Sequence, residues 1–265
     1  MRTITLLTDF GLKDGNVGVM KGVIWSITPD AQIVDLSHLI SPQNVREAAL
    51  ILSRSAPYFP EGSIHVVVVD PGVGTERRPI AAQLGPYYFV GPDNGVISML
   101  LEWAEGQDLP IQFVHLDNPL YWLPEVSHVF HGRDIFAPAA GYLAGGVPLD
   151  KLGTSIDDPV RLTLPQPQAS GRGWLGEVIH IDHFGNISSN IRHEHLDERK
   201  TWAVSICGVE IHGLVRTFGE RQPGELVILY GSTGNLIVSV VNGSASDRLG
   251  AQIGDSVEVF ISNGN

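Results

Sequence analysis

Strand-like and helix-like patterns alternate along the N-terminal part of the chain. A short run rich in β-branched residues, Thr3–Thr8, precedes a segment, Asn16–Ile27, in which apolar side chains recur every three to four residues. Ile64–Val69 is a run of β-branched residues, interrupted only by His65, without alternation of polar and apolar positions, which is typical of a strand covered on both faces. The same reasoning predicts strands at Ile33–Leu36, Ile80–Leu84, Tyr87–Val90 and Ile111–His115, and helices at Val45–Ala56, Val96–Glu105 and Ile135–Ala144. This alternation predicts an α/β domain with a central, mostly parallel sheet.

The pattern changes after a segment rich in Pro, Gln, Ser and Gly at residues 165–172, which we interpret as a linker. Short strand-like runs follow, separated by Gly, Asn and Asp, and the one candidate helix is Glu194–Arg199. These runs are Trp174–Ile181, Thr201–Ile206, Val209–Ile211, Glu225–Tyr230, Asn235–Val240 and Ser256–Ile261. We therefore expect two domains, an α/β domain over residues 1–164 and a small all-β barrel over residues 173–265.

Composition narrows the functional classes. The 265 residues carry 17 Lys+Arg against 29 Asp+Glu, a formal net charge of −12. An acidic chain without a basic run argues against nucleic-acid or anionic-membrane partners. One cysteine, Cys207, excludes an internal disulfide and is interpreted as a small core residue. With no membrane-spanning apolar run and no signal peptide, we expect a soluble, cytoplasmic protein.

Two carboxylates follow the first predicted strand. Asp9 stands next to Gly11, which lets the chain turn or a ligand come close, and Asp14 lies five residues further on. A carboxylate at the end of a first strand can hold a ribose diol, a metal or a substrate amine. Either aspartate can equally cap the following helix, and the residues alone leave these alternatives open.

A second loop follows the most buried predicted strand. Asp70 begins a glycine-rich segment that ends in Arg77 and Arg78. If the loop folds back, a carboxylate and a guanidinium meet over one small polar site, where the arginine can hold a water or an anion. The alternative is a turn whose arginines are solvated. The glycine spacing fits neither a dinucleotide fingerprint nor a phosphate-binding loop.

His131 precedes a glycine and a predicted helix start, where an exposed imidazole can act on a small polar species. The sequence gives little support for a metal site. His128 and His131 fall on a strand-to-helix turn and not on one helical face, and alternation separates the polar groups at 180–183. His193–His195 lacks the spacing of a zinc motif and reads as a surface turn.

The segment Tyr230–Asn235 offers hydroxyls and N–H groups for a carboxylate or amine, or it is a hairpin turn. Taken together, the residues supply an aspartate, an arginine and a histidine without a serine elbow, a cysteine nucleophile or a metal cluster. Such a set suits the activation of a small nucleophile such as water. The pattern does not name the substrate.

Several motifs together resemble one family. They are TDFG at Thr8–Gly11, DPGVGTERR at Asp70–Arg78, GPDNG at Gly91–Gly95, FHGRDIFAP at Phe130–Pro138, IDHFGN at Ile181–Asn186 and YGSTGNL at Tyr230–Leu236. The chain is similar to the S-adenosyl-L-methionine (SAM) hydroxide adenosyltransferases, the adenosine-forming SAM hydrolases related to the SAM-dependent fluorinase and chlorinase. The resemblance covers nearly the whole chain in order.

This resemblance implies a fold, a reaction and an assembly. It implies an N-terminal α/β domain, a C-terminal β-barrel, and a homotrimer with active sites between subunits. The reaction would be SAM plus water giving adenosine and L-methionine, with no cofactor and no metal. It also implies roles: a water-activating triad of Asp70, Arg77 and His131; a ribose-binding Asp9; Asp14, Asp182 and Ser232 around the methionine part; and Phe184, Asn186 and Phe218 around adenine.

Two details refine the resemblance. In the halogenases, residues resembling tyrosine occupy the first and last triad positions. Gly132 stands where the fluorinase has a halide-contacting serine. Both differences favour a hydrolase. Gln43 departs from the family, whose members usually carry an aromatic followed by an acid over the ribose. The competing hypotheses are a SAM-dependent halogenase and a non-catalytic protein that binds SAM or adenosine.

Overall fold

A computed structural model describes residues 2–262 of the chain. The backbone divides into two compact units, and the division falls between Leu162 and Thr163. Part of the segment interpreted as a linker, Gln168–Ser170, forms strand β8 and pairs with the second unit's sheet. The domain limits drawn from the sequence otherwise stay a prediction.

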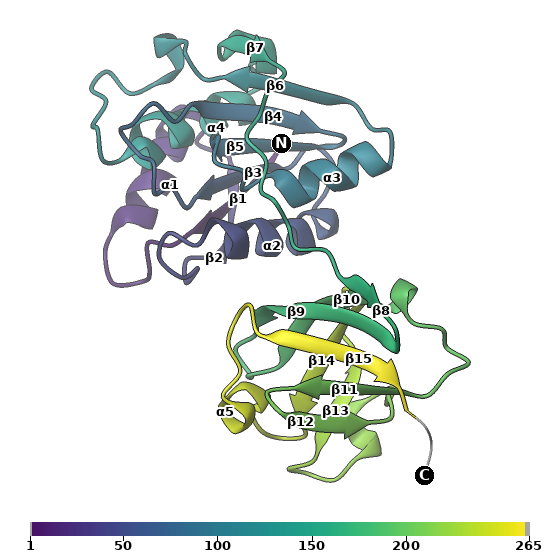
Figure 1. Cartoon of the computed structure of the whole chain (residues 1–265). Coiled ribbons are helices and arrows are strands. Elements are labelled where there is room, and N and C mark those ends of the chain that lie inside the picture. Colours follow the sequence, from purple (N-terminus) through teal and green to yellow (C-terminus); the bar gives the residue numbers. More distant parts are fainter. Residues whose placement is uncertain (1, 263–265) are drawn as a thin grey trace. The chain divides into compact units, whose positions relative to one another are not determined.

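The first unit is built on a seven-stranded sheet with the order β2-β1-β3-β5-β4-β6-β7 (Figure 1). Its strands are β1 (Thr3–Thr8), β2 (Gln32–Ser37), β3 (Ile64–Val68), β4 (Pro79–Leu84), β5 (Tyr87–Pro92), β6 (Ile111–His115) and β7 (Thr154–Ile156). Pairings among β2, β1, β3 and β5 are parallel, whereas those from β5 through β4 and β6 to β7 are antiparallel. The α/β prediction is confirmed, with a sheet that is mixed.

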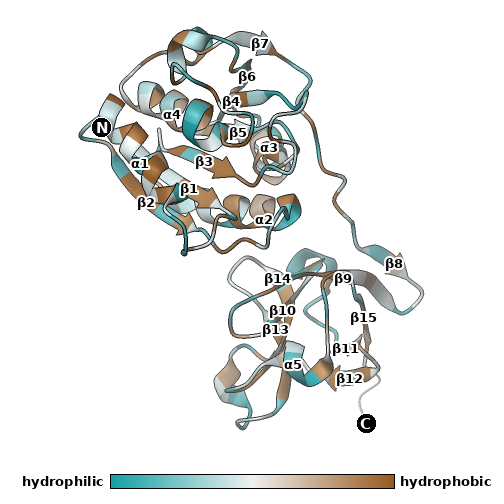
Figure 2. Ribbon diagram, turned by 90° about the vertical axis from the view of Figure 1, so that its left-hand side faces the viewer, coloured by the Kyte–Doolittle hydropathy of each residue, from teal (hydrophilic) through white to brown (hydrophobic). Residues whose placement is uncertain are grey.

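Helices cover both faces of this sheet. They are α1 (Asn16–Ile27), α2 (Val45–Ser55), α3 (Ser98–Gly106) and α4 (Ala137–Ala144), with shorter helical turns at Ala56–Tyr58, Pro119–Tyr121, Gly132–Phe136 and Leu149–Lys151. Helices α1 and α4 pack on one face and α2 and α3 on the other. Strand β3 contributes Val66 to one core and Val67 to the other, which is why its residues other than His65 are all apolar (Figure 2).

The second unit is an antiparallel sheet in the order β12-β11-β15-β9-β10-β14-β13, with β8 beside β9. The strands are β9 (Gly173–Ile181), β10 (Ile187–Arg192), β11 (Trp202–Ile206), β12 (Val209–His212), β13 (Leu226–Tyr230), β14 (Asn235–Val240) and β15 (Ser256–Ile261). A bridge from Leu214, just after β12, to Ile228 of β13 brings the two ends of the sheet together. The sheet is therefore nearly closed around one core, as the barrel prediction requires.

The structure corrects three local expectations in this unit. Glu194–Arg199 is not a helix, because only one 3-10 turn forms, at His193–His195. A short helix not predicted from the sequence, α5 (Ala245–Leu249), ends at Gly250 in the left-handed region, and a further 3-10 turn lies at Phe218–Glu220. Cys207 is exposed in the β11–β12 turn with a positive φ of 49°, so it is not a core residue. Among the described residues, no helix has the length and apolarity to span a membrane.

Candidate active site

Two predicted site carboxylates lie at the same edge of the first sheet. Strands β1 and β3 are parallel neighbours with Thr8 opposite Val68, so Asp9 and Asp70 both follow the carboxyl ends of adjacent strands. From β1 the chain continues to β2 on one side, and from β2 it crosses back to β3 on the other. Ligands in open α/β sheets bind at such a switch point, because the two loops diverge there and leave a crevice.

Asp70 and Arg77 form a buried ion pair at this edge. The guanidinium donates from Nε to Asp70 Oδ1 at 3.0 Å and from Nη2 to Asp70 Oδ2. Their side chains are only 5% and 7% exposed, respectively. The two-point contact fixes the plane of the guanidinium relative to the carboxylate. The alternative of solvated arginines is therefore wrong for Arg77.

His131 completes the cluster. Its Nδ1 lies 3.1 Å from Arg77 Nη2. A guanidinium only donates, so Nδ1 is the acceptor and the neutral ring carries its proton on Nε2. Burial lowers the pKa of His131 below its usual 6.5, and the Arg77 charge lowers it further, against the opposing charges of Asp70 and Asp134. The imidazole is consequently neutral at pH 7.

Two glycines make this meeting of distant segments sterically possible. Gly74 has a φ of 75°, and a Cβ there would lie 2.2 Å from the carbonyl oxygen of His128. Gly132 packs against strand β3 and helix α1, where a Cβ would lie 3.2 Å from Val68 Cγ1. Both glycines let the loop after β3 and the turn before α4 pack against their neighbours. The result is that Arg77 and His131, 54 residues apart in sequence, share a hydrogen bond.

One donor in the cluster has no hydrogen-bond partner within residues 2–262. Arg77 Nη1 is buried and makes no hydrogen bond to any described residue. The guanidinium also lies over the Phe136 ring, with 5.5 Å from its carbon to the ring centroid. A buried donor without a partner is costly, so it marks a place where a small acceptor, such as water or hydroxide, is stabilised.

Asp9 is held by an unusual backbone. The N–H of Gln43 donates to Asp9 Oδ2 at 2.8 Å, and Gln43 has a φ of 64°. The residue that departs from the family pattern therefore contacts the predicted ribose carboxylate through its backbone. Asp14, by contrast, is exposed in the loop before α1.

The predicted adenine residues come together in the second unit. Phe184, Asn186 and Phe218 line one cavity of about 440 Å³, together with Val240, Asn242 and Gly243. Phe184 is 73% exposed, which is unusual for a phenylalanine and leaves a ring face available. Sequence reasoning missed Asn242, although the Asn-Gly dipeptide marks a turn and Asn242 has a φ of 56°.

The two remaining predicted site residues differ. Asp182 organises the turn after β9, because its Oδ1 accepts from the backbone N–H groups of Phe184 and Asn186, both at 2.9 Å. Its Oδ2 accepts from the Asn186 side chain at 2.7 Å. Ser232 lies in the exposed β13–β14 turn, at the other end of this hairpin from Val240. The structure therefore does not bring Ser232 to the cavity within this unit.

No group of three or more His, Cys, Asp or Glu residues among residues 2–262 is arranged to hold a metal ion. His193–His195 forms the predicted surface turn. Arg133 pairs with its neighbour Asp134, with Nε 2.5 Å from Oδ1.

Two family models match the chain in order. The N-terminal domain of the SAM hydroxide adenosyltransferases matches residues 4–153, and the C-terminal domain of the same family matches residues 176–258. The chain belongs to the SAM hydroxide adenosyltransferase family. Membership confirms the resemblance drawn from the motifs.

Curated relatives and solved structures agree with this assignment. Proteins named (R)-S-adenosyl-L-methionine hydrolase from Salinispora tropica and Thermus thermophilus are 39% and 40% identical, covering 97% and 98% of this chain and 97% and 100% of their own. A fluorinase from Actinoplanes is 28% identical over 89% of this chain and 90% of its own. A crystal structure of an uncharacterized conserved protein from Thermotoga maritima superposes with a TM-score of 0.89 at 35% identity, covering 97% of this chain and 99% of that one.

Proposed function

We propose that this enzyme hydrolyses SAM to adenosine and L-methionine by attack of an activated water on the C5′ carbon. The observation that carries the proposal is the buried Asp70–Arg77–His131 cluster, with its unpartnered Arg77 donor, at the switch point of the first sheet. Family membership and the names of the hydrolase relatives support it. No cofactor is expected, because the sulfonium of SAM already provides a good leaving group.

In this proposal each of the three side chains has its own chemical role. Arg77 Nη1 holds the water oxygen and stabilises hydroxide character, and the neutral His131 orients it through Nε2–H. The Asp70 carboxylate accepts the proton. As the oxygen–C5′ bond forms, the C5′–sulfur bond breaks and its electron pair leaves with methionine as a neutral thioether. Holding water in line with C5′ is the main contribution asked of the protein.

The recognition residues follow the same proposal. Asp9 binds the ribose diol, and its oxygen is already oriented by the Gln43 N–H. The rings of Phe184 and Phe218 contact the face or the edge of the adenine, and Asn186 forms hydrogen bonds with it. Asp14, Asp182 and Ser232 are assigned to the methionine part on the resemblance alone.

A halogenase is the second candidate, because fluorinases are among the relatives. Their lower identity and Gly132 argue against it. A serine Cβ at position 132 would lie 3.2 Å from Val68 Cγ1 and 3.4 Å from the Met20 sulfur, so it would be crowded in this backbone. A halide also needs a binding site free of negative charge, whereas the triad contains the carboxylate of Asp70 beside the imidazole of His131.

The deciding experiment incubates the purified protein with SAM in ¹⁸O-labelled water. We expect catalytic formation of adenosine carrying the label in its 5′-hydroxyl group, and equimolar methionine. Parallel reactions with added fluoride or chloride are expected to yield adenosine only. Formation of 5′-halo-5′-deoxyadenosine would favour the halogenase. Binding of SAM without turnover would favour a non-catalytic sensor and overturn the proposal.

Assembly and location stay predictions from the resemblance and composition. We propose a homotrimer in the cytoplasm that takes neither nucleic acid nor membrane as partner. Light scattering on the purified protein tests the assembly, since a trimer has three times the 28.7 kDa mass of the chain.

A further inference from the structure

The loop Asp93–Gly95, which follows β5, contacts the chain directly before Asp70. Asn94 Nδ2 donates to the carbonyl oxygen of Val69 at 2.9 Å. Asn94 is itself fixed, because its Oδ1 accepts from the N–H of Val96 at 3.2 Å. This side chain therefore fixes the backbone one residue before the catalytic carboxylate.

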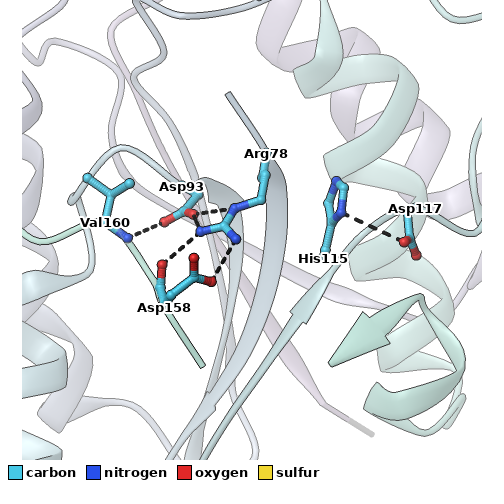
Figure 3. A network of polar contacts seen from close by, with 6 residues as sticks. All are labelled: Arg78, Asp93, His115, Asp117, Asp158 and Val160. Atoms are coloured by element: carbon cyan, nitrogen blue, oxygen red, sulfur yellow. Dashed lines mark hydrogen bonds and ion pairs between the residues drawn. The ribbon is translucent and has the colours of Figure 1, made fainter. Parts of the chain in front are cut away.

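The same loop holds the chain directly after Arg77. Arg78 donates from Nε and Nη2 to Asp93 Oδ2, at 2.9 and 2.6 Å (Figure 3). The backbone N–H of Asp93 donates to the Arg78 carbonyl at 2.9 Å. The Asp93 side chain is only 1% exposed, so this is a buried and geometrically defined contact. The guanidinium of Arg78 therefore pairs with Asp93, whereas that of Arg77 pairs with Asp70.

Between these two anchors the loop is weakly fixed by its own backbone. Its internal backbone–backbone hydrogen bonds, from Val73 to Asp70 and from Thr75 to Gly72, are both 3.2 Å long. The Thr75 hydroxyl adds a bond to the Gly72 carbonyl at 2.7 Å and one from the Arg77 N–H at 3.3 Å. Gly72 and Gly74 add conformational freedom. The spacing between Asp70 and Arg77 consequently depends on what holds the two ends of the loop.

A third segment joins the network from the end of the first unit. Val160 N–H donates to Asp93 Oδ1 at 2.7 Å, and Arg78 also donates to the side chain and the carbonyl of Asp158, at 2.7 and 2.8 Å (Figure 3). Gly95 has a φ of 89°, and a Cβ there would lie 2.8 Å from Leu162 Cγ. Leu162 is the last residue of this unit, so the chain packs against this loop directly before it enters the second unit.

We propose that Arg78, Asp93 and Asn94 are positioning residues that hold Asp70 and Arg77 in their two-point contact, and that Asp93 ties the exit segment Asp158–Leu162 to this contact. None of the three is assigned to the substrate, and they act through the backbone on either side of the pair. The inference rests on the proposed hydrolysis, in which Arg77 stabilises the attacking oxygen. Displacement of the guanidinium would lower turnover without removing any group that binds SAM.

The test uses variants that leave no unpaired buried charge. The double variant Arg78→Gln/Asp93→Asn removes both charges together, which avoids the penalty of orphaning one partner. Asn94→Ala removes a single hydrogen bond and provides an independent second variant. The matched control is Glu105→Gln/Arg161→Gln, which deletes a two-point Arg–carboxylate pair between α3 and the same exit segment.

We expect the Arg78/Asp93 variant to lose about ten- to a hundredfold in kcat, as misplacement by about 1 Å would cause. Its Kd for SAM, measured by calorimetry on the full chain, should stay within about twofold of the wild type. The NMR signal of the Arg77 Nε–H, which is protected by Asp70, should broaden or exchange faster. Asn94→Ala should show the same changes to a smaller degree, and the control should show neither.

The inference would be overturned if Asn94→Ala and the folded double variant both kept the wild-type kcat and an unchanged NMR signal of the Arg77 Nε–H. The inference would also be overturned if the double variant lost no more kcat than the control Glu105→Gln/Arg161→Gln. A wild-type protein that releases no adenosine would instead refute the proposed function. Arg77→Ala is the reference variant in the active protein, because the hydrolase mechanism requires it to lose most of its kcat.

Discussion

The two units bury different kinds of polar side chain. Among the described residues, the buried polar groups of the first unit include four titratable side chains, His38, His65, Asp93 and Asp134. Those of the second unit are neutral: Ser188, Ser189, Asn235 and Ser239. The first unit also encloses the side chains of Asp70 and Arg77 almost completely, whereas the second presents Phe184 and Phe218 to solvent.

We infer from this difference that the first unit carries the catalytic groups and the second contributes to substrate binding. Charges in a buried environment interact strongly and need not reorganise during the reaction, so the first unit suits the stabilisation of a transition state. Exposed aromatic rings provide apolar area and stacking faces, which suits the binding of a base. We therefore expect substitutions in the first unit to change mainly kcat, and those at the second unit's cavity to change mainly the affinity for SAM.

The largest effect is expected at Arg77. Arg77→Ala removes the proposed donor to the attacking oxygen and should lower kcat by about 10²–10³-fold, the usual loss for one such donor. The Kd for SAM should change little. Adenosine release measured by chromatography and binding measured by calorimetry provide the two values, and undiminished release by this variant would refute the assigned role.

The next effect is expected at Gly74, where the loop passes the His128 carbonyl. Gly74→Ala places a Cβ 2.2 Å from that oxygen and in a left-handed conformation, so the loop must move. We expect kcat to fall by up to about a hundredfold. Gly106→Ala, at the end of α3 where a Cβ meets nothing within 4 Å, is the matched control. Equal kcat values for the two variants would contradict the close-approach argument.

Acid should destabilise the first unit through His65. Burial lowers the pKa of His65 from 6.5 to about 4, and its Nδ1 shares a hydrogen bond with Thr5. In the unfolded chain His65 becomes protonated near pH 6.5, whereas in the folded protein it becomes protonated only near pH 4. Stability contributed by neutral His65 is therefore present above pH 6.5 and falls as the pH drops, by about 2 kcal/mol near pH 5.

Denaturant unfolding at pH 7 and pH 5 measures this loss. The variant His65→Gln should show a pH dependence shallower by the same amount, even where its stability at pH 7 is lower. An identical pH dependence in the variant and the wild type would show that the acid sensitivity has another origin.

The smallest effect is expected at the cavity of the second unit. Phe184→Ala removes an exposed ring and should weaken SAM binding about tenfold, because stacking of one base on an aromatic side chain is worth about 1–3 kcal/mol. kcat at saturating SAM should stay near the wild-type value. Val209→Ala, an exposed apolar residue of the same unit that does not line the cavity, is the control. A drop in kcat without a change in affinity would reverse the division between the units.

Much of the fold could be predicted from periodicity. Strand β3 is apolar except for His65 because two cores cover it, and the predicted bounds of α1 match the observed ones. The failures have local causes. Strand β10 carries Ser188, Ser189 and Asn190 in a mostly buried position, where hydrogen bonds such as Ser189 to the Leu236 carbonyl compensate for their polarity. Hydrophobic pattern alone cannot anticipate such compensation.

The site was predictable in its residues and not in its contacts. Asp70, Arg77 and His131 stood out because they follow a buried strand or precede a helix. Their shared hydrogen bonds depend on the approach of segments 54 residues apart, which leaves no signature in local pattern. Asp93 and Asn94 were noticed only as part of a motif, since their partners Arg78 and Val69 come from another strand end.

By itself, the sequence determined the two-part architecture, the acidic balance, the family and the residue types able to activate water. These properties depend on composition, on short-range periodicity and on motifs that survive without knowledge of contacts. Only the tertiary structure decided which arginine pairs with Asp70, which nitrogen of His131 keeps its proton, and that Gln43 orients Asp9 with its backbone. The reason is physical: each of these depends on distances between groups far apart in the chain, and burial there sets both their charge and their geometry.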